Sequence, residues 1–215
     1  MNKIIPYDDI REDLLPYARD VIATALDTYS AEDNCVFIHT IGLQASGKST
    51  YTKHLHRHLP GYAYVGFDKI MEDHPRYWDC FHTHGAEQAL EEWEKPARAI
   101  GYHLLQTLLE NKRSIIFEHS AAHKDHPRLI KTAMDWGYIT EMHYIPCSPE
   151  LSIGRAKKRK RKGGRHVPEE RIWERHALLE ELLPIYRHLP HRFVTVKSVF
   201  GDIYRPFILA QQAAP

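Results

Sequence analysis

The pattern of apolar and polar residues divides this chain into two kinds of segment that alternate along it. Five short runs are rich in apolar residues, as buried strands are, and longer stretches with helical spacing of apolar positions separate them. The predicted strands cover residues 35–41, 62–67, 113–117, 138–145 and 192–199. The predicted helices cover residues 7–29, with a bend near Pro16, and residues 48–59, 85–110, 127–136, 149–162 and 168–189. This alternation predicts an α/β fold in three layers, with helices on both faces of a parallel sheet connected by right-handed crossovers.

The first predicted strand runs into a glycine-rich turn that matches the phosphate-binding pattern GxxxxGKS. Its two glycines let the backbone curl so that amide N–H groups converge on phosphate oxygens. Lys48 can reach the β- and γ-phosphates, Ser49 can offer its hydroxyl to Mg²⁺, and the following helix points its positive dipole end at the anion. An ordinary glycine-rich turn is the alternative. We predict a P-loop NTPase fold that binds a nucleoside triphosphate, with Ser49 as the metal ligand and a binding loop formed by Gly42, Leu43, Gln44, Ala45, Ser46, Gly47, Lys48, Ser49 and Thr50.

Acidic residues end the second and third predicted strands, at the sheet edge where ligands bind. Asp68 can accept a proton from a substrate hydroxyl there; the alternative is a helix N-cap for a segment that starts at Lys69. Glu118 can bind substrate or hold the water shell of Mg²⁺, and the alternative is a surface-loop acid. We expect a functional role for both carboxylates.

Residues 155–165 form a strongly basic run that contains the pair Gly163-Gly164. Its position between the fourth and fifth predicted strands favours a helical lid, which spans about residues 155–168 and closes Arg159 and Arg165 over the γ-phosphate. A solvated helix face and a nucleic-acid patch are the alternatives.

The overall composition predicts one domain over residues 1–215, with a helical N-terminal segment at 1–34. The net charge of +1 does not attract the chain to nucleic acid or to a membrane surface. We find no apolar stretch near the length of a membrane span and no secretion signal, so we expect a cytoplasmic protein. The odd number of cysteines favours reduced core thiols at Cys35, Cys80 and Cys147.

Sixteen histidines raise the question of a metal site, above all at His82 and His84 and at His119, His123 and His126. Their spacing matches no familiar zinc pattern. We therefore predict histidines that face solvent or substrate and bind no zinc.

Taken in order, five pieces of the chain resemble the zeta-toxin family of P-loop kinases over about residues 36–180. These pieces are the phosphate loop, the stretch from Asp68 to His74-Pro75, Ile115-Ile116-Phe117-Glu118, the segment from Gly137-Tyr138 to Pro149-Glu150-Leu151, and Arg159 with Arg165-His166-Val167-Pro168. The resemblance implies phosphorylation of UDP-N-acetylglucosamine or related sugar nucleotides. It also implies that Asp68 is the catalytic base, that Glu118 contacts the sugar and that Arg159 and Arg165 are lid arginines. An antitoxin protein as partner is implied by the resemblance alone.

The chain departs from the family pattern in three places. Glu118-His119-Ser120 stands where the family usually has Glu-Gly-Thr, and Met71 replaces a basic residue that commonly follows the catalytic aspartate. The lid is also shorter than in long toxins. The kinase chemistry therefore carries over better than the identity of the acceptor.

Our leading hypothesis is a Mg-ATP-dependent phosphotransferase that acts on a hydroxyl of a small molecule such as a nucleotide sugar. Asp68, Lys48, Arg159 and Arg165 are its predicted catalytic residues. Its predicted substrate-binding residues are Glu118, His119 and Ser120. The alternatives are an ATP-switched nucleic-acid-associated protein or polynucleotide kinase that uses the basic run, and a GTPase-type switch, for which the chain lacks the AsnLysxAsp element.

Overall fold

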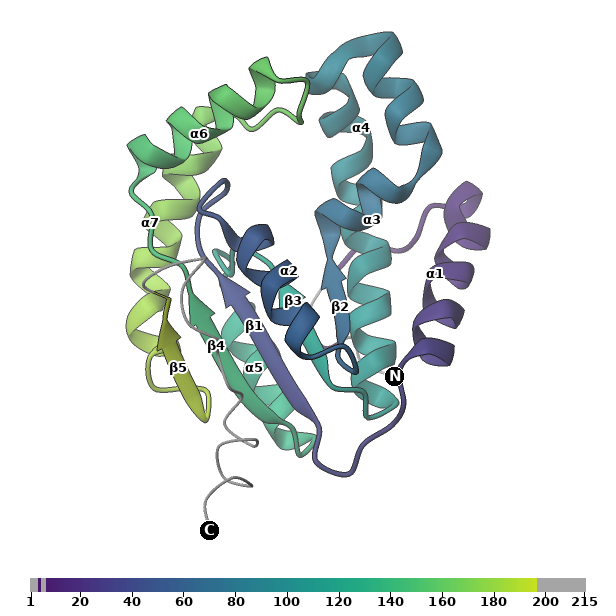
Figure 1. The fold of residues 1–215 in the computed structure, drawn as a ribbon, viewed down its shortest axis with the longest axis vertical. Helices are drawn as coiled ribbons and strands as arrows, with labels where there is room; N and C mark the ends of the chain where they lie inside the picture. The colour runs from purple at the N-terminus through teal and green to yellow at the C-terminus, as the bar shows by residue number, and fades with distance from the viewer. Residues whose placement is uncertain (1–3, 5–6, 197–215) are drawn as a thin grey trace.

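The computed structural model describes residue 4 and residues 7–196 of the 215-residue chain. In this part of the chain, five parallel strands form one sheet in the order β2-β3-β1-β4-β5 (Figure 1). The strands are β1 (Val36–Ile41), β2 (Ala63–Gly66), β3 (Ile115–Glu118), β4 (Ile139–Tyr144) and β5 (Arg192–Thr195). The predicted parallel α/β fold is confirmed. The end of the last predicted strand, at residues 197–199, lies outside the described residues.

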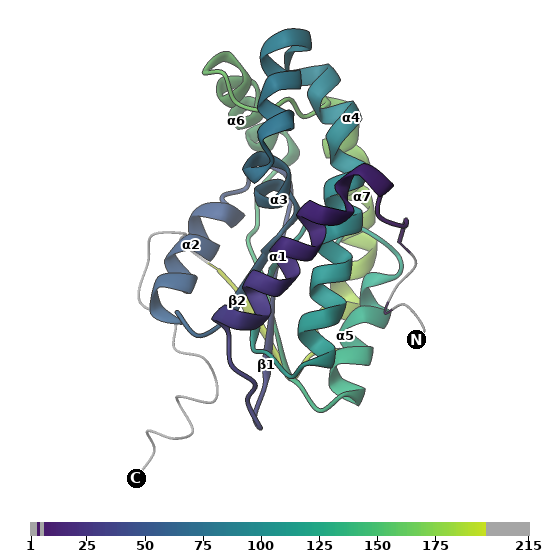
Figure 2. The ribbon, with the colours of Figure 1, turned by 90° about the vertical axis from the view of Figure 1, so that its right-hand side faces the viewer.

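Helices cover both faces of the sheet (Figures 1 and 2). The helical elements of the described residues are the short 3₁₀ turn η1 (Glu12–Leu14) and α1 (Leu15–Thr28), α2 (Lys48–His58), α3 (Phe67–Asp73), α4 (Pro75–Glu110), α5 (His126–Asp135), α6 (Pro149–Arg161) and α7 (Glu169–Tyr186). Successive residues of β1 point to opposite faces: Val36 and Ile38 pack with Leu55 of α2, whereas Phe37 and Ile41 join the core formed with α4, α5 and α7. Apolar residues on both faces explain the almost continuous apolar composition of this strand.

Two helices differ from the sequence-based expectation. Helix α4 consists of two helical pieces separated by a kink at Gly85, whose φ of 87° is a backbone conformation that only glycine adopts easily; the piece after Gly85 is the predicted one, and the piece from Pro75 to His84 was not predicted. The first predicted helix begins only at Leu15, after η1. Pro16 then lies at the helix start, where its missing N–H has no partner to lose, so it causes no bend.

Helix α1 packs against α4 of the same chain. The Tyr17 hydroxyl donates a hydrogen bond to the carbonyl of Ile70, which ties α1 to α3 as well. Cys35 and Cys80 are buried and Cys147 is half-buried, all three as free thiols. None of the described helices combines the length and apolar content needed to cross a membrane.

The strand register brings the predicted functional segments to one edge. Glu118 at the end of β3 pairs with Thr40 of β1 on one side and with Gly66 of β2 on the other. The phosphate loop follows β1, and Asp68 follows β2 by two residues. Three segments that are distant in sequence therefore meet at the carboxyl end of the sheet.

Candidate active site

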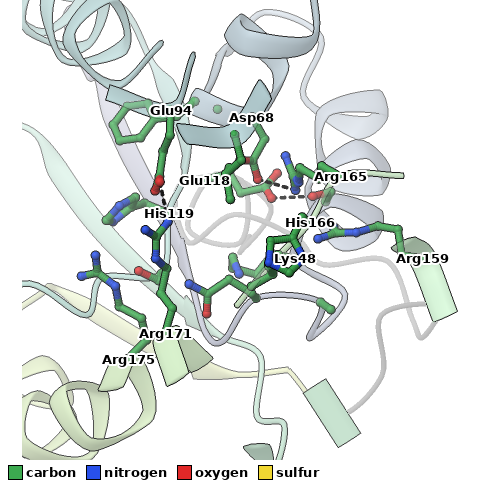
Figure 3. Close-up of a pocket in the computed structure, with 18 of the residues that line it drawn as sticks. Lys48, Asp68, Glu94, Glu118, His119, Arg159, Arg165, His166, Arg171 and Arg175 are labelled. Atoms are coloured by element: carbon green, nitrogen blue, oxygen red, sulfur yellow. Dashed lines mark hydrogen bonds and ion pairs between the residues drawn. The ribbon is translucent and has the colours of Figure 1, made fainter. Parts of the chain in front are cut away.

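A cavity of about 360 Å³ opens at this edge of the sheet (Figure 3). Its walls come from the phosphate loop, the ends of β2 and β3, helix α4, helix α6 with the loop that follows it, and the start of α7. Twelve of the predicted site residues line it: Gln44, Ala45, Gly47, Lys48, Ser49, Thr50, Asp68, Glu118, His119, Ser120, Arg159 and Arg165. Gly42, Leu43 and Ser46 complete the loop but are buried beneath its surface.

The phosphate loop has the backbone conformation that its glycines were expected to allow. Gly42 has φ of 142°, and a Cβ at this position would lie 2.6 Å from the carbonyl oxygen of Ile145. Gly47 has φ of 107° and precedes the first residue of α2. The Lys48 ammonium donates hydrogen bonds to the carbonyls of Gly42 (2.9 Å) and Leu43 (2.6 Å). Burial lowers the pKa of Lys48, while the carboxylates of Glu118 and Asp68 act in the opposite direction.

Glu118 is 7% exposed and accepts three hydrogen bonds from hydroxyl groups. One carboxylate oxygen accepts from Ser49 at 2.5 Å, and the other accepts from Thr52 at 2.8 Å and from Tyr64 at 2.6 Å. The alternative of a surface-loop acid is therefore wrong. The adjacent oxygens of Ser49 and Glu118 are the hard ligands that Mg²⁺ prefers, so the residues present fit this ion.

Asp68 lies in the first turn of α3 and is about half exposed. The helix begins at Phe67 and its N-cap is Gly66, so Asp68 is not the N-cap that the structural alternative required. Its carboxylate forms an ion pair with Arg165 at 2.5 Å, and Glu72 lies 3.3 Å from the same guanidinium. Burial alone would lower the pKa of Arg165, but these two carboxylates outweigh it and the pKa is raised.

Arg159 lies on α6 and lines the same cavity. Its Nε and Nη2 atoms are buried and have no hydrogen-bond partner among the described residues. Gly164 makes room for this side chain, because a Cβ at Gly164 would lie 2.6 Å from Arg159 Cγ. Burial and the neighbouring Arg165 lower the pKa of Arg159. A buried guanidinium with unused donors is suited to binding an anion.

The basic run 155–165 is held in place by contacts outside itself. Arg155 donates to the carbonyl of Ser46 in the phosphate loop at 3.2 Å, and Lys160 pairs with Glu87 of α4 at 2.5 Å. Gly163 ends α6 in a left-handed conformation with φ of 75°. Three residues of the run, Arg155, Arg159 and Arg165, line the cavity, as expected for a lid. Movement of the lid about Gly163-Gly164 stays a prediction, and nucleic-acid binding stays an untested alternative.

Four charged residues of the cavity wall were missed in the sequence. They are Glu94 and Arg98 on α4 and Arg171 and Arg175 on α7. Each pair has the i, i+4 spacing of one helix face, which could have been noticed, but charged residues with this spacing usually face solvent.

Three histidine rings lie close together at the cavity: His39 and His126 are buried, and His119 is half-buried and lines the cavity. One nitrogen of each of His39, His119 and His126 lies within 4.8 Å of the others. His39 and His126 have no exposed surface and His126 does not line the cavity, so the expectation that the histidines face solvent or substrate is wrong for His126. Burial lowers the pKa of His119 and His126 well below the usual value, and the charges of Arg98 and Arg175 add to this effect. The rings of His119 and His126 stack at 19° next to two cations, which suits neutral imidazoles better than a metal dication, and the absence of zinc stays a prediction.

Comparison with known proteins identifies a matching protein family and solved structures with a similar fold. A family model described as Zeta toxin matches residues 20–199. A structure from the PezAT chromosomal toxin-antitoxin system of Streptococcus pneumoniae superposes with a TM-score of 0.69 at 14% identity, covering 93% of this chain and 83% of that chain. A putative kinase from Chloroflexus aurantiacus gives a TM-score of 0.55 at 16% identity, covering 84% of this chain and 97% of that chain. The comparison with curated proteins found no match.

Proposed function

We propose that this chain, which belongs to the zeta toxin family and is a P-loop kinase, moves the γ-phosphoryl group of Mg-ATP to a hydroxyl of a small molecule. The observation that carries the proposal is the composition of one cavity. The phosphate loop, the carboxylate of Asp68 and the guanidinium groups of Arg159 and Arg165 all line it. Transfer between two oxygens requires these parts: a phosphate cradle, a proton acceptor and positive charge around the transferred group.

The cations of the site have separate roles in this proposal. Lys48 exchanges its two backbone acceptors for phosphate oxygens when the nucleotide binds. Arg159 directs its unpartnered donors to the phosphoryl oxygens, where negative charge spreads during transfer. Arg165 neutralises charge on the same group and holds the loop after α6 against α3 through Asp68.

Mg²⁺ would be held by the Ser49 hydroxyl and by water that the Glu118 carboxylate binds. When bound, it neutralises the phosphate oxygens and orients them for attack. Of the two functions predicted for Glu118, support of the metal is favoured because one of its oxygens is 2.5 Å from Ser49 Oγ. Three donated hydrogen bonds keep this carboxylate in one position.

The acceptor hydroxyl lies beside Asp68, which takes its proton in this proposal. His119 and Ser120 line the cavity after β3 and are available for hydrogen bonds to the acceptor. His119 is neutral at pH 7 because burial lowers its pKa, and its Nδ1 accepts a hydrogen bond from the Ala121 N–H at 3.1 Å, so the proton lies on Nε2, which can donate. A nucleotide sugar such as UDP-N-acetylglucosamine is the acceptor we favour by family membership.

The test is transfer of labelled γ-phosphate from ATP to a panel of metabolites that includes UDP-N-acetylglucosamine and other nucleotides. We expect a labelled product that depends on Mg²⁺. Lys48→Met serves as the inactive control, since it removes the charge that reaches the phosphates. Nucleotide binding without transfer to any small molecule would count against the proposal.

A protein antitoxin is a further part of this proposal. One of the similar structures comes from a toxin-antitoxin system, which supports testing for such a partner here. Growth of cells that express the wild-type chain or Lys48→Met measures toxicity directly. Equal growth of the two strains would remove the reason to expect an antitoxin.

A further inference from the structure

Three arginine side chains line the cavity on the side away from Arg159 and Arg165. Arg98 comes from α4, and Arg171 and Arg175 come from successive turns of α7. Figure 3 shows Arg171 and Arg175 across the cavity from the Asp68–Arg165 pair, beyond Lys48. The cavity thus has two separate cationic regions, one at the lid and one where α4 faces α7.

Two of the three guanidinium groups at this second region share one carboxylate in the cavity wall. Arg171 forms an ion pair with Glu94, and Arg98 lies 3.9 Å from the other oxygen of the same carboxylate. Arg175 donates instead to the backbone carbonyl of Ala122, which carries no charge. Among the described residues, these three positive charges therefore have one carboxylate between them at ion-pair distance, and Arg175 has none.

The three arginines lie close enough for their positive charges to repel one another. Burial lowers the pKa of Arg175, and Arg98 and Arg171 lower it further, while Glu94 and Glu174 act in the opposite direction. The side chain of Arg98 is 27% exposed and that of Arg171 is 35% exposed, so both can reach a molecule in the cavity. A guanidinium group presents a planar fork of donors that matches the oxygens of a phosphate.

We propose that Arg98, Arg171 and Arg175 form an anion subsite that binds a phosphate or diphosphate group of the acceptor. That the bound molecule is the phosphate acceptor rests on the proposed kinase function. The anion subsite itself rests only on the positions of the three arginine charges. The acceptor is then a hydroxy compound that already carries phosphate, with its hydroxyl beside Asp68 and its phosphate between α4 and α7. Neutral sugars and alcohols bind poorly because they leave the partly desolvated arginine charges uncompensated.

Binding of inorganic phosphate tests the subsite without any kinase activity. The full chain is first saturated with Mg²⁺ and a non-hydrolysable ATP analogue, so that the phosphate loop is filled, and is then titrated calorimetrically with phosphate. We expect wild type to bind phosphate and Arg171→Gln to bind it roughly 10-fold or more weakly, since a hydrogen-bonded charge is removed. Arg171→Lys should lie between the two, and Arg128→Gln on the exposed face of α5 should behave as wild type. No binding by loaded wild type, or equal binding by Arg171→Gln, would overturn the subsite.

Kinetics with an identified acceptor provides the second measurement. For a phosphorylated acceptor, we expect Arg98→Gln and Arg171→Gln to raise KM roughly 10-fold or more and to leave the KM for ATP little changed. For the same compound without its phosphate, wild type and variants should differ little. Equal KM increases for both compounds would overturn the assignment of the phosphate to this subsite. If calorimetry shows the subsite but no hydroxyl compound accepts phosphate, the kinase proposal fails and the anion subsite stands.

Discussion

The Arg165 guanidinium lies 2.5 Å from the Asp68 carboxylate and joins the loop after α6 to the first turn of α3. Arg165 is 12% exposed, whereas Asp68 is 56% exposed, so the arginine is fixed while the carboxylate still reaches the cavity. Glu72, one turn further along α3, holds the same guanidinium at 3.3 Å. The pair therefore places a positive charge next to the proposed proton acceptor, an arrangement that the proposed phosphoryl transfer would use.

Replacing Asp68 by asparagine removes the proton acceptor and keeps the size of the side chain. We expect the rate of transfer to fall by about 10²- to 10⁴-fold, with little change in ATP affinity. The control is Asp73→Asn, at an exposed position of the same helix. Rates should be measured with saturating ATP and acceptor. Full activity of Asp68→Asn would remove Asp68 from the base role.

Replacing Arg159 by alanine tests the lid. Arginines that stabilise a transferring phosphoryl group contribute about 10³-fold or more to kcat, and we expect a loss of that order. Stability should change little, because Nε and Nη2 of Arg159 have no hydrogen bond to lose. Arg161→Ala, at an exposed position of the same helix, is the matched control. An active Arg159→Ala enzyme with unchanged kcat would show that the arginine does not act on the phosphate.

Replacing Gly42 by alanine tests the geometry of the phosphate loop. The new methyl group would lie 2.6 Å from the carbonyl oxygen of Ile145, and the residue would keep φ of 142°, which strains any side chain. We expect a loss of about 1–3 kcal/mol in the free energy of unfolding and at least a roughly 10-fold loss of ATP affinity. Gly61→Ala is the control, because nothing lies within 4 Å of its Cβ position. Denaturant unfolding and calorimetry measure the two quantities, and wild-type values for Gly42→Ala would contradict the assigned loop conformation.

Because several histidines are buried, we expect the free energy of unfolding to fall at acidic pH. Burial lowers the pKa of His39 from 6.5 to about 3. An unfolded chain therefore binds this proton below about pH 6.5 while the folded chain does not, so stability is complete above that pH and is lost as the pH falls toward 3. One such group changes the free energy of unfolding by up to about 1.4 kcal/mol per pH unit within this window.

In the variant His39→Phe, the free energy of unfolding should depend less steeply on pH, by the contribution of one titrating group, because the phenyl ring cannot be protonated. Urea unfolding at several pH values between neutral and mildly acidic measures the slope. The exposed His58→Gln is the control and should keep the wild-type slope. An unchanged slope in His39→Phe would show that His39 is not the group that resists protonation.

Much of the fold could be predicted because it depends on short-range patterns. The apolar runs predict the strands, and the GxxxxGKS pattern predicts the loop that follows β1. The errors lie where tertiary contacts compete with local signals. The helical piece at residues 75–84, before the kink at Gly85, was not predicted, and residues 7–11 before η1 are not helical although the predicted helix included them.

The sequence by itself determined the phosphate loop, the order of strands and helices, and the acids at the ends of β2 and β3. Only the tertiary structure decided that Ser49 bonds to Glu118, that Arg165 pairs with Asp68, and that arginines of α4 and α7 face one cavity. The reason is physical. A backbone pattern is set by neighbours a few residues apart, whereas convergence of side chains depends on strand register and on how helices pack across the sheet.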